Sequence, residues 1–295
     1  MSIYLFTNQS PGAPEFKQGS GTMINVLDYC LVTGMGWTKT FSGTNTATYR
    51  APTGNRFYLG IDDTSTTNFR LRGFEVATSA GTAITSGINP FPNDSQVSGG
   101  LYIVKRQAMS TPWFLISDGL IFYFCCNYTA GTPEHNDGMC FGDFIPYATY
   151  DTFNTVIKGS YDTGNSGFQN TSKLRNVVNT TYIARSATQL GGSTYANFII
   201  DVSRSKSDFR IGGSGTPFPH PITNTLDLGI VEIGDSIGIR GRLPGIWCPF
   251  HTYGSFANGD TYTSNTLNRS FIARKFGYSS ETSTIFFETT DNWRS

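Results

Sequence analysis

Short stretches of aromatic and β-branched residues, set between breaks rich in glycine, asparagine and aspartate, run along the whole chain. Residues 56–61, 113–116 and 284–287 are examples. Aromatic and β-branched side chains favour strands, while Gly, Asn and Asp favour the tight turns that join them. Outside one N-terminal segment, almost no stretch has the apolar spacing that an amphipathic helix needs. The sequence therefore predicts a mainly β protein.

The predicted strands follow one another closely, with no helix between them. Residues 56–61 and 69–76 are joined by a polar connection, and residues 113–116 and 120–126 are joined by a turn sequence at 117–119. Strands separated by turns rather than helices pack as antiparallel sandwiches or barrels and not as βαβ units. We therefore expect antiparallel, sandwich- or barrel-like β lobes.

One short α-helix is expected, at residues 22–32 near the N-terminus. Its apolar residues are spaced so that they share one face; they are Met23, Ile24, Leu27, Cys30 and Leu31. Thr22 stands where an N-cap is expected, and Gly34 stands where helices commonly end. We interpret the segment as a packing helix.

The chain is expected to divide into three parts, because its 295 residues suffice for one large β domain or two medium ones. The parts are an extended N-terminal arm (1–20), a helix with a first β lobe (21–160) and a second β lobe (161–295). Residues 146–153 and 249–256 share Pro, Thr, Tyr and Phe at matching places, which suggests that the lobes arose by duplication. A single large β domain is the alternative.

Charge is sparse and balanced, with 21 Lys and Arg against 21 Asp and Glu. This balance argues against nucleic acid as a direct partner. The apolar stretches are too short to span a membrane, and the start lacks the basic region of a signal peptide, so we expect cytoplasmic synthesis. A polar surface with so few charges favours burial in an assembly, or contact with sugars.

No nucleophile elbow, Walker loop, Rossmann glycine pattern or H-E-x-x-H motif occurs in the sequence. Asp62 and Asp63 form the obvious carboxylate pair, and glycosidases need two carboxylates at a defined separation. Neighbours on a strand point apart, however, and these two end a strand just before a polar turn. We therefore interpret them as solvated or turn-capping residues.

The cysteines do not form a disulfide framework; they are Cys30, Cys125, Cys126, Cys140 and Cys248. A zinc site built from Cys125, Cys126, His135 and Cys140 is one alternative. Adjacent cysteines on a strand point to opposite faces, so buried thiols are the favoured interpretation.

Two further sets of residues have both a chemical and a packing interpretation. Cys248 and His251 suggest a thiol nucleophile and its base, but three residues apart in a Pro-containing loop is poor geometry for that pair. The tryptophans could stack on sugars, yet most lie in strand-like apolar contexts; they are Trp37, Trp113, Trp247 and Trp293. We favour packing for both sets, and we assign no catalytic, metal-binding or cofactor-binding residue and no cofactor.

Several segments together resemble virion structural proteins of tailed bacteriophages. They are the opening residues 1–4 with 11–14, the helical segment 23–32, and residues 36–41, 56–64, 69–75, 112–119 and 240–247. The resemblance covers most of the chain. It implies a non-enzymatic particle component, present in multiple copies in the tail tip, baseplate or neck or on the capsid surface. Its expected partners are further copies of itself and neighbouring virion proteins, and it carries over no catalytic residue.

Three expectations follow for how the chain acts. The arm at residues 1–20 is expected to add a strand to the sheet edge of a neighbour. One rival function is a host-receptor module whose loops, such as residues 129–138, contact surface glycans. The other is a glycan depolymerase that uses Asp62 or Asp63 with another acid.

Overall fold

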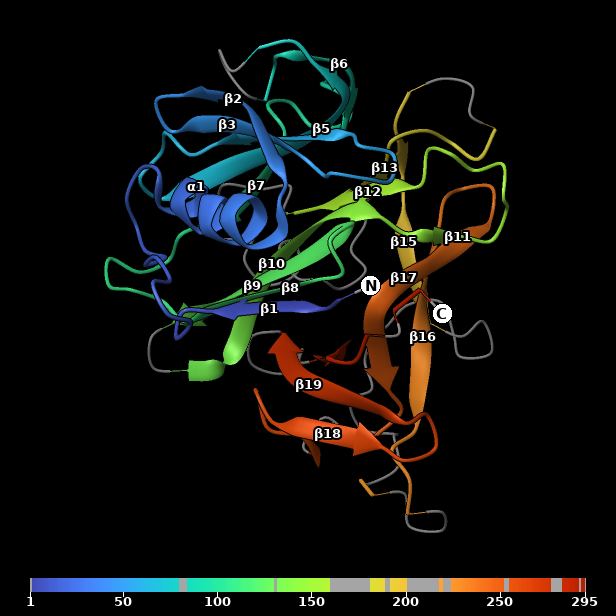
Figure 1. The fold of residues 1–295 in the computed structure, drawn as a ribbon. Coiled ribbons are helices and arrows are strands. Elements are labelled where there is room, and N and C mark those ends of the chain that lie inside the picture. The colour runs from blue at the N-terminus through green and yellow to red at the C-terminus, as the bar shows by residue number, and fades with distance from the viewer. Residues whose placement is uncertain are drawn as a thin grey trace.

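The computed structural model describes most of the chain. This part of the chain folds into three antiparallel sheets and one short helical segment (Figure 1). The described residues are 2–79, 84–129, 132–159, 181–188, 192–200, 218–219, 224–251, 255–276, 283–291 and 293–294. Of the residues, 47% are in strands and 7% are in helices, so the predicted mainly β class with one short N-terminal helix is confirmed. Among the described residues, no helix is long and apolar enough to cross a membrane.

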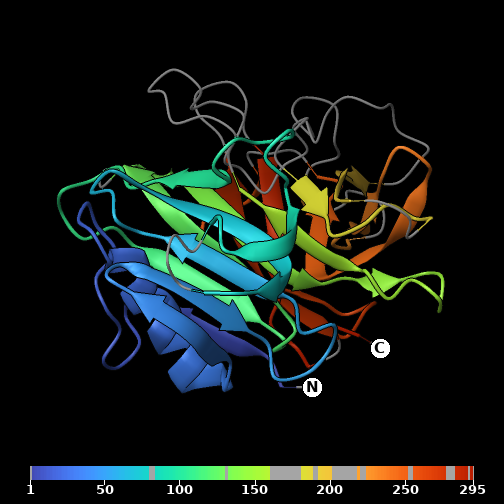
Figure 2. The same cartoon turned by 90° about the horizontal axis from the view of Figure 1, so that it is seen from above.

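Sheet A lies in the middle of the molecule, with sheet B and sheet C on opposite sides of it (Figure 2). Its strands, in spatial order, are β1 (Tyr4–Thr7), β8 (Trp113–Ser117), β9 (Ile121–Thr129), β10 (Thr132–Asp143), β12 (Thr155–Lys158), β13 (Thr181–Ile183) and β14 (Thr194–Tyr195).

Both faces of sheet A are buried. Along β9, Phe122 and Phe124 point into the core shared with sheet B, called here the A–B core. Tyr123 and Cys125 point into the core shared with sheet C, called here the A–C core. Successive side chains of a strand alternate between faces, so a sheet covered on both sides buries its residues at every position. β8 shows this directly, because all its residues are buried.

Sheet B and the helical segment close one side of sheet A. The strands of sheet B are β2 (Thr38–Gly43), β3 (Thr46–Arg50), β4 (Tyr58–Asp62), β5 (Asn68–Ala77) and β6 (Gly87–Phe91) in spatial order, with β7 (Leu101–Val104) paired to β5. Figure 1 shows α1 (Thr22–Leu27) between sheet B and β1. Met23, Val26 and Leu27 of this helix are buried in the A–B core.

Sheet C closes the other side. Its strands are β15 (Asn197–Ile200), β16 (Leu228–Gly234), β17 (Ile239–Pro249), β20 (Ser283–Glu288), β19 (Arg269–Phe276) and β18 (Thr261–Ser264) in spatial order, with β11 (Ile145–Pro146) paired to β17. Part of its far face is covered by a third, smaller cluster that includes Leu226, Phe256 and Phe286.

The helix begins where the sequence predicts, but its cap is different. Gly21 occupies the N-cap position and supplies no side-chain hydrogen bond, and the helix continues after Leu27 as a π-helical segment, η1 (Asp28–Gly34). Instead of a local cap, Asp63 Oδ2 accepts hydrogen bonds from the backbone N–H groups of Met23 (2.7 Å) and Ile24 (3.3 Å). The predicted N-cap role of Thr22 is therefore wrong, because a carboxylate forty positions later satisfies the free helix N–H groups.

Asp63 also forms a fully buried ion pair with Lys105, whose ammonium lies against its Oδ1. The Lys105 ammonium further donates to the carbonyl oxygens of Gly19 (2.5 Å) and Ser65 (3.1 Å). Burial raises the pKa of Asp63 and lowers the pKa of Lys105, while their mutual attraction opposes both changes. One ion pair thus joins the start of α1, the end of β4 and the end of β7.

The N-terminal arm is bound to its own chain. β1 pairs with β8 in sheet A, and the Phe16 carbonyl accepts a hydrogen bond from the Thr111 N–H at 2.7 Å. The Phe16 side chain is only 2% exposed and lies in the A–B core. The apolar residues of this arm therefore complete the core of the same chain. Whether the arm also adds a strand to a neighbour stays a prediction.

The boundary expected near residue 160 separates two strands of one sheet. β12 before it and β13 after it pair directly, with Val156 opposite Ile183. The described strands on both sides therefore belong to sheet A. Whether the two predicted lobes arose by duplication stays a prediction.

Replacing Lys105 by Met is expected to destabilise the fold by about 3–5 kcal/mol, because it leaves the Asp63 carboxylate buried without its counter-charge. The double variant Asp63→Asn, Lys105→Met should be less destabilised than Lys105→Met alone, since Asn keeps a cap acceptor without a charge. Urea unfolding of the wild type and the variants measures these free energies.

Lys17→Met is the matched control, because Lys17 pairs with Glu15 at 2.5 Å on the exposed surface. Such surface pairs contribute less than about 1 kcal/mol. Equal losses for Lys17→Met and Lys105→Met would show that the buried pair does not hold the fold together.

Candidate functional site

The two adjacent carboxylates have separate structural roles. Asp62 Oδ1 accepts hydrogen bonds from the N–H (3.1 Å) and the hydroxyl (2.6 Å) of Thr64, which confirms the turn-capping interpretation. Asp63 has no exposed surface and caps α1, so the solvated or turn-capping interpretation is wrong for this residue. A catalytic acid must contact its substrate, so the geometry gives no support to Asp63 as an acid of a glycan depolymerase.

The cysteines lie in the cores. Cys125 is in the A–C core and Cys126 is in the A–B core, so these neighbours point to opposite faces as predicted. Burial raises the pKa of both thiols, and it raises the pKa of Cys140 to about 12. The His135 side chain lies outside the described residues. In the described part of the chain, no three His, Cys, Asp or Glu residues are grouped so that they could hold a metal ion.

Cys248 and His251 have packing roles. Burial raises the pKa of the Cys248 thiol to about 12, so the thiol stays protonated at neutral pH. His251 Nε2 accepts a hydrogen bond from the Asp227 backbone N–H at 2.8 Å, and its ring lies edge-on to Phe218 and Phe256. This confirms the packing interpretation and gives no support to a nucleophile–base pair.

Three of the tryptophans are core residues, as predicted. Trp37, Trp113 and Trp293 are at most 3% exposed. Their indole N–H groups donate to the carbonyl oxygens of Gly119, Pro14 and Glu288, at distances of 3.0, 3.0 and 2.9 Å. Buried indoles usually find such partners. Trp247 differs, because it is only partly buried.

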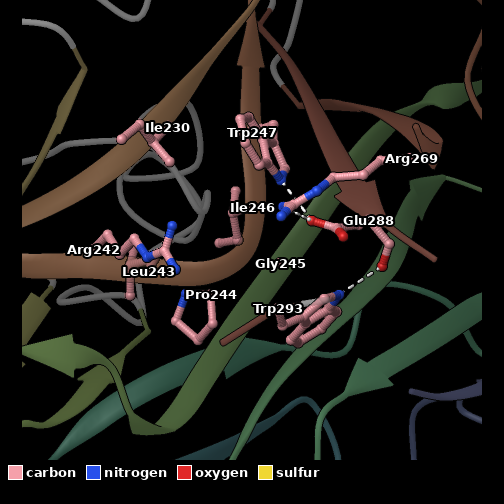
Figure 3. A pocket seen from close by; sticks show the side chains of 10 residues that line it. All are labelled: Ile230, Arg242, Leu243, Pro244, Gly245, Ile246, Trp247, Arg269, Glu288 and Trp293. Carbon is pink, nitrogen blue, oxygen red and sulfur yellow. Dashed lines mark hydrogen bonds and ion pairs between the residues drawn. The ribbon is translucent and has the colours of Figure 1, made fainter. Parts of the chain in front are cut away.

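Trp247 lines a small hollow on sheet C (Figure 3). Its indole N–H and the Arg269 guanidinium both donate to Glu288 Oε2 at 2.9 Å, and the guanidinium lies 5.3 Å from the Trp247 ring centroid. The space open to the centre of a water molecule is about 10 Å³, which suits about one water and is too small for a sugar. Trp247, Arg269 and Glu288 therefore hold neighbouring strands together.

The segment expected to be a receptor-contacting loop is largely strand. Residues 132–138 lie in β10, and Asn136 and Asp137 are opposite Asn127 and Cys126 of β9. These residues have a polar composition typical of turns, but their backbone pairs with the buried strand β9 and is extended. The expectation of a loop is therefore wrong for residues 132–138, and their contact with glycans stays a prediction.

The best candidate for an interaction site is a group of exposed apolar side chains on and beside strands β16 and β17 of sheet C. Five of the eleven exposed large hydrophobic side chains in the described part of the chain belong to β16, β17 or the segments joined to them. We call this surface the β16–β17 face; it consists of Tyr147, Tyr150, Ile230, Ile237 and Ile239. The inward-pointing neighbours Val231 and Ile233 fill the A–C core.

Polar groups hold the β16–β17 face in place. The Tyr147 hydroxyl donates to Glu232 Oε1 at 2.6 Å. Desolvation and the Glu232 carboxylate raise the pKa of Tyr147 to about 12. The buried Arg240 guanidinium binds both carboxylate oxygens of Asp151, at 2.7 and 2.8 Å, which ties the segment after β11 to β17. The face is therefore preorganised.

Sequence reasoning missed this face. Its clearest signal is Ile237, which is 62% exposed in the turn between β16 and β17. Asp235 Oδ1 accepts hydrogen bonds from the N–H groups of Ile237 (2.9 Å) and Gly238 (3.4 Å), so the turn itself is an ordinary Asx-capped one. A β-branched apolar residue in such a turn is unusual, and that contrast was available in the sequence.

Comparisons with known proteins do not extend these observations. A scan against protein-family models finds no match, and a search of curated proteins finds no matching sequence.

Lys158 is predicted to make stability depend on pH. Burial lowers its pKa from 10.5 to about 7, and it lies opposite Cys140 in sheet A. Between these two values the unfolded chain binds a proton that the folded chain does not, so this contribution to stability falls as pH drops from about 10 to 7. The slope is at most about 1.4 kcal/mol per pH unit.

The measurement is the difference in unfolding free energy between the wild type and Lys158→Met, at several pH values from neutral to alkaline. Because buried thiols act in the opposite direction above about pH 8.5, the difference isolates Lys158. It should favour the wild type increasingly as pH rises. A difference independent of pH would contradict a lowered Lys158 pKa.

Proposed function

We propose that this chain is a non-enzymatic structural component of a tailed bacteriophage particle, present in multiple copies. The observation that carries the proposal is the β16–β17 face, which presents isoleucine and tyrosine side chains to solvent from strands of sheet C and from the segments joined to them. Exposed large apolar side chains that occur together are typical of protein–protein contact sites. Its proposed place is the virion, after assembly in the host cytoplasm.

The buried polar side chains bind groups of the same chain, which supports the proposal. Asp63, Lys105 and Arg240 each bind groups of the same chain that hold layers or strands together. The residues that sequence patterns had suggested for catalysis, Cys248 and His251 among them, are likewise engaged in packing. This distribution suits a subunit that contributes shape and surface to an assembly.

The sequence resemblance gives the class of assembly. The chain is neutral, with 14% charged residues, so copies do not repel one another at long range. We propose further copies of the chain and neighbouring virion proteins as its partners. The tail tip, baseplate, neck and capsid surface all remain candidate positions.

Replacing Ile237 by Asp should reduce the amount of the chain in purified particles by about tenfold, which corresponds to about 1.4 kcal/mol of contact free energy. A carboxylate at the centre of an apolar contact must lose its water, whereas the same change on a solvent-exposed turn leaves the fold intact. Quantitative mass spectrometry of purified particles measures the incorporation.

Ile88→Asp is the matched control, because Ile88 is 53% exposed on β6 of sheet B, away from the face. It should leave incorporation unchanged. Absence of the wild-type chain from particles would refute the proposal, and equal incorporation of both variants would remove the β16–β17 face as its basis.

A host-receptor module is the second candidate, favoured by the exposed tyrosines Tyr147 and Tyr150, which are 53% and 71% exposed. Tyrosine rings on a rigid support can stack on sugar rings. Replacing Tyr150 by Ala should then lower the adsorption of particles to host cells severalfold while their content of the chain stays constant. Unchanged adsorption would count against this candidate.

A further inference from the structure

β18 is the last strand of sheet C and has an open edge. β18 pairs with β19 on one side, and Figure 1 shows it at the end of the sheet. Ser270 lies opposite Thr263, and its carbonyl accepts a hydrogen bond from Thr289 on the β20 side. In an antiparallel pair, the residues opposite such outward-bonded positions also point their backbone groups away. The N–H and C=O groups of Thr263, and by the same alternation those of Thr261, therefore face outward.

These backbone groups have no hydrogen-bond partner among the residues that the structure describes. The side chains of Thr261 and Thr263 are exposed as well. The strand contains no charged residue and no proline. Natural proteins normally protect an edge strand with such residues or with a bulge.

Other sheet edges of this chain are protected. On β1, the outward N–H groups near its two ends are bound by side chains, that of Ile3 by Asp291 (2.8 Å) and that of Thr7 by Ser10 (3.0 Å). β2 has a register shift at its Lys39 end, and β6 contains Pro90. The unprotected edge of β18 contrasts with these three.

We propose that β18 pairs with β18 of a second copy of the chain, antiparallel about a two-fold axis, so that sheet C continues from one copy into the next. This inference rests on the proposed function, because it assigns a contact between copies within the assembly. It names a different surface from the β16–β17 face.

The register of the two paired β18 strands follows from their outward-facing backbone N–H and C=O groups. A two-fold axis through Tyr262 places Thr261 of one copy opposite Thr263 of the other, and the reverse. Directly opposed, outward-facing residues exchange both backbone hydrogen bonds. The two such pairs then use every outward N–H and C=O group of Thr261 and Thr263 in both copies. The strand is therefore complementary to itself.

The side chains agree with this pairing. Threonines opposed across strands stabilise a sheet, and so do opposed aromatic residues such as the two Tyr262 rings. Tyr262 is already held in place, because its ring packs edge-on against Phe218 and Phe256. No charges oppose each other within the paired strands, and the chain has no net charge. A second copy therefore fits this edge without repulsion.

Disulfide trapping of variants with one introduced cysteine each tests the register. The Thr261→Cys and Thr263→Cys variants of the full chain are prepared separately. The two variants are then mixed and oxidised. Opposed residues have Cα atoms about 5.5 Å apart, within the range that a disulfide spans. Thr261 of one copy and Thr261 of the other are offset by two further residues along the strand. Their Cα atoms are therefore more than about 7 Å apart, and each variant alone should stay uncross-linked.

A covalent dimer in the mixture, and in neither variant alone, is the expected result. The native cysteines give little background, because all five are buried and free. No dimer in the mixture, or equal dimer in the separate variants, would overturn the proposal. The second result would indicate random collisions, and the first an edge that carries another partner or none.

Charge variants separate this inference from the proposed function. Thr261→Lys with Thr263→Lys sets like charges opposite each other, whereas Thr261→Lys with Thr263→Glu sets opposite charges together. The first should reduce incorporation into particles about tenfold relative to the second. Equal incorporation would refute β18 pairing and leave the proposed function standing, whereas absence of the wild-type chain from particles would refute the proposed function itself.

Discussion

The burial of sheet A on both faces is the constraint on which the rest of the molecule depends. A strand such as β9 must supply Phe122 to one core and Tyr123 to the other, so neither face can present chemistry to solvent. Polar groups that enter this interior must be satisfied there. The Asp63–Lys105 pair does so at the start of α1. Asp143 does so by accepting hydrogen bonds from Thr155 (2.6 Å) and Asn55 (2.7 Å).

This constraint moves function to the periphery. Lys158 and Cys140, whose pKa values are shifted, lie inside the three-layered body, where desolvation shifts them. Perturbed groups often mark active sites, but these line no described cleft, and their shifts follow from burial. The outer layer, sheet C, presents the β16–β17 face and the edge of β18. A chain with a filled interior and an unprotected outer sheet is suited to association.

Local patterns predicted what depends on local sequence, and they failed where tertiary contacts decide. Alternation placed Cys125 and Cys126 on opposite faces, and the turn after β4 identified Asp62 as a cap. The N-cap of α1 could not be found in this way, because Asp63 reaches it only after β4 folds against the helix. Residues 132–138 look like a loop by composition, yet pairing with β9 makes them strand. Association surfaces are harder still, since exposure exists only once the layers are assembled.

Sheet C is proposed to form the contacts by which copies of this chain associate within a particle. A cryo-EM map of the purified particle tests it most directly. We expect density of a neighbouring subunit over the β16–β17 face, and a second copy whose β18 continues sheet C. A map in which the chain occupies the particle with sheet C open to solvent, and with sheet B or α1 at the subunit contacts, would contradict it.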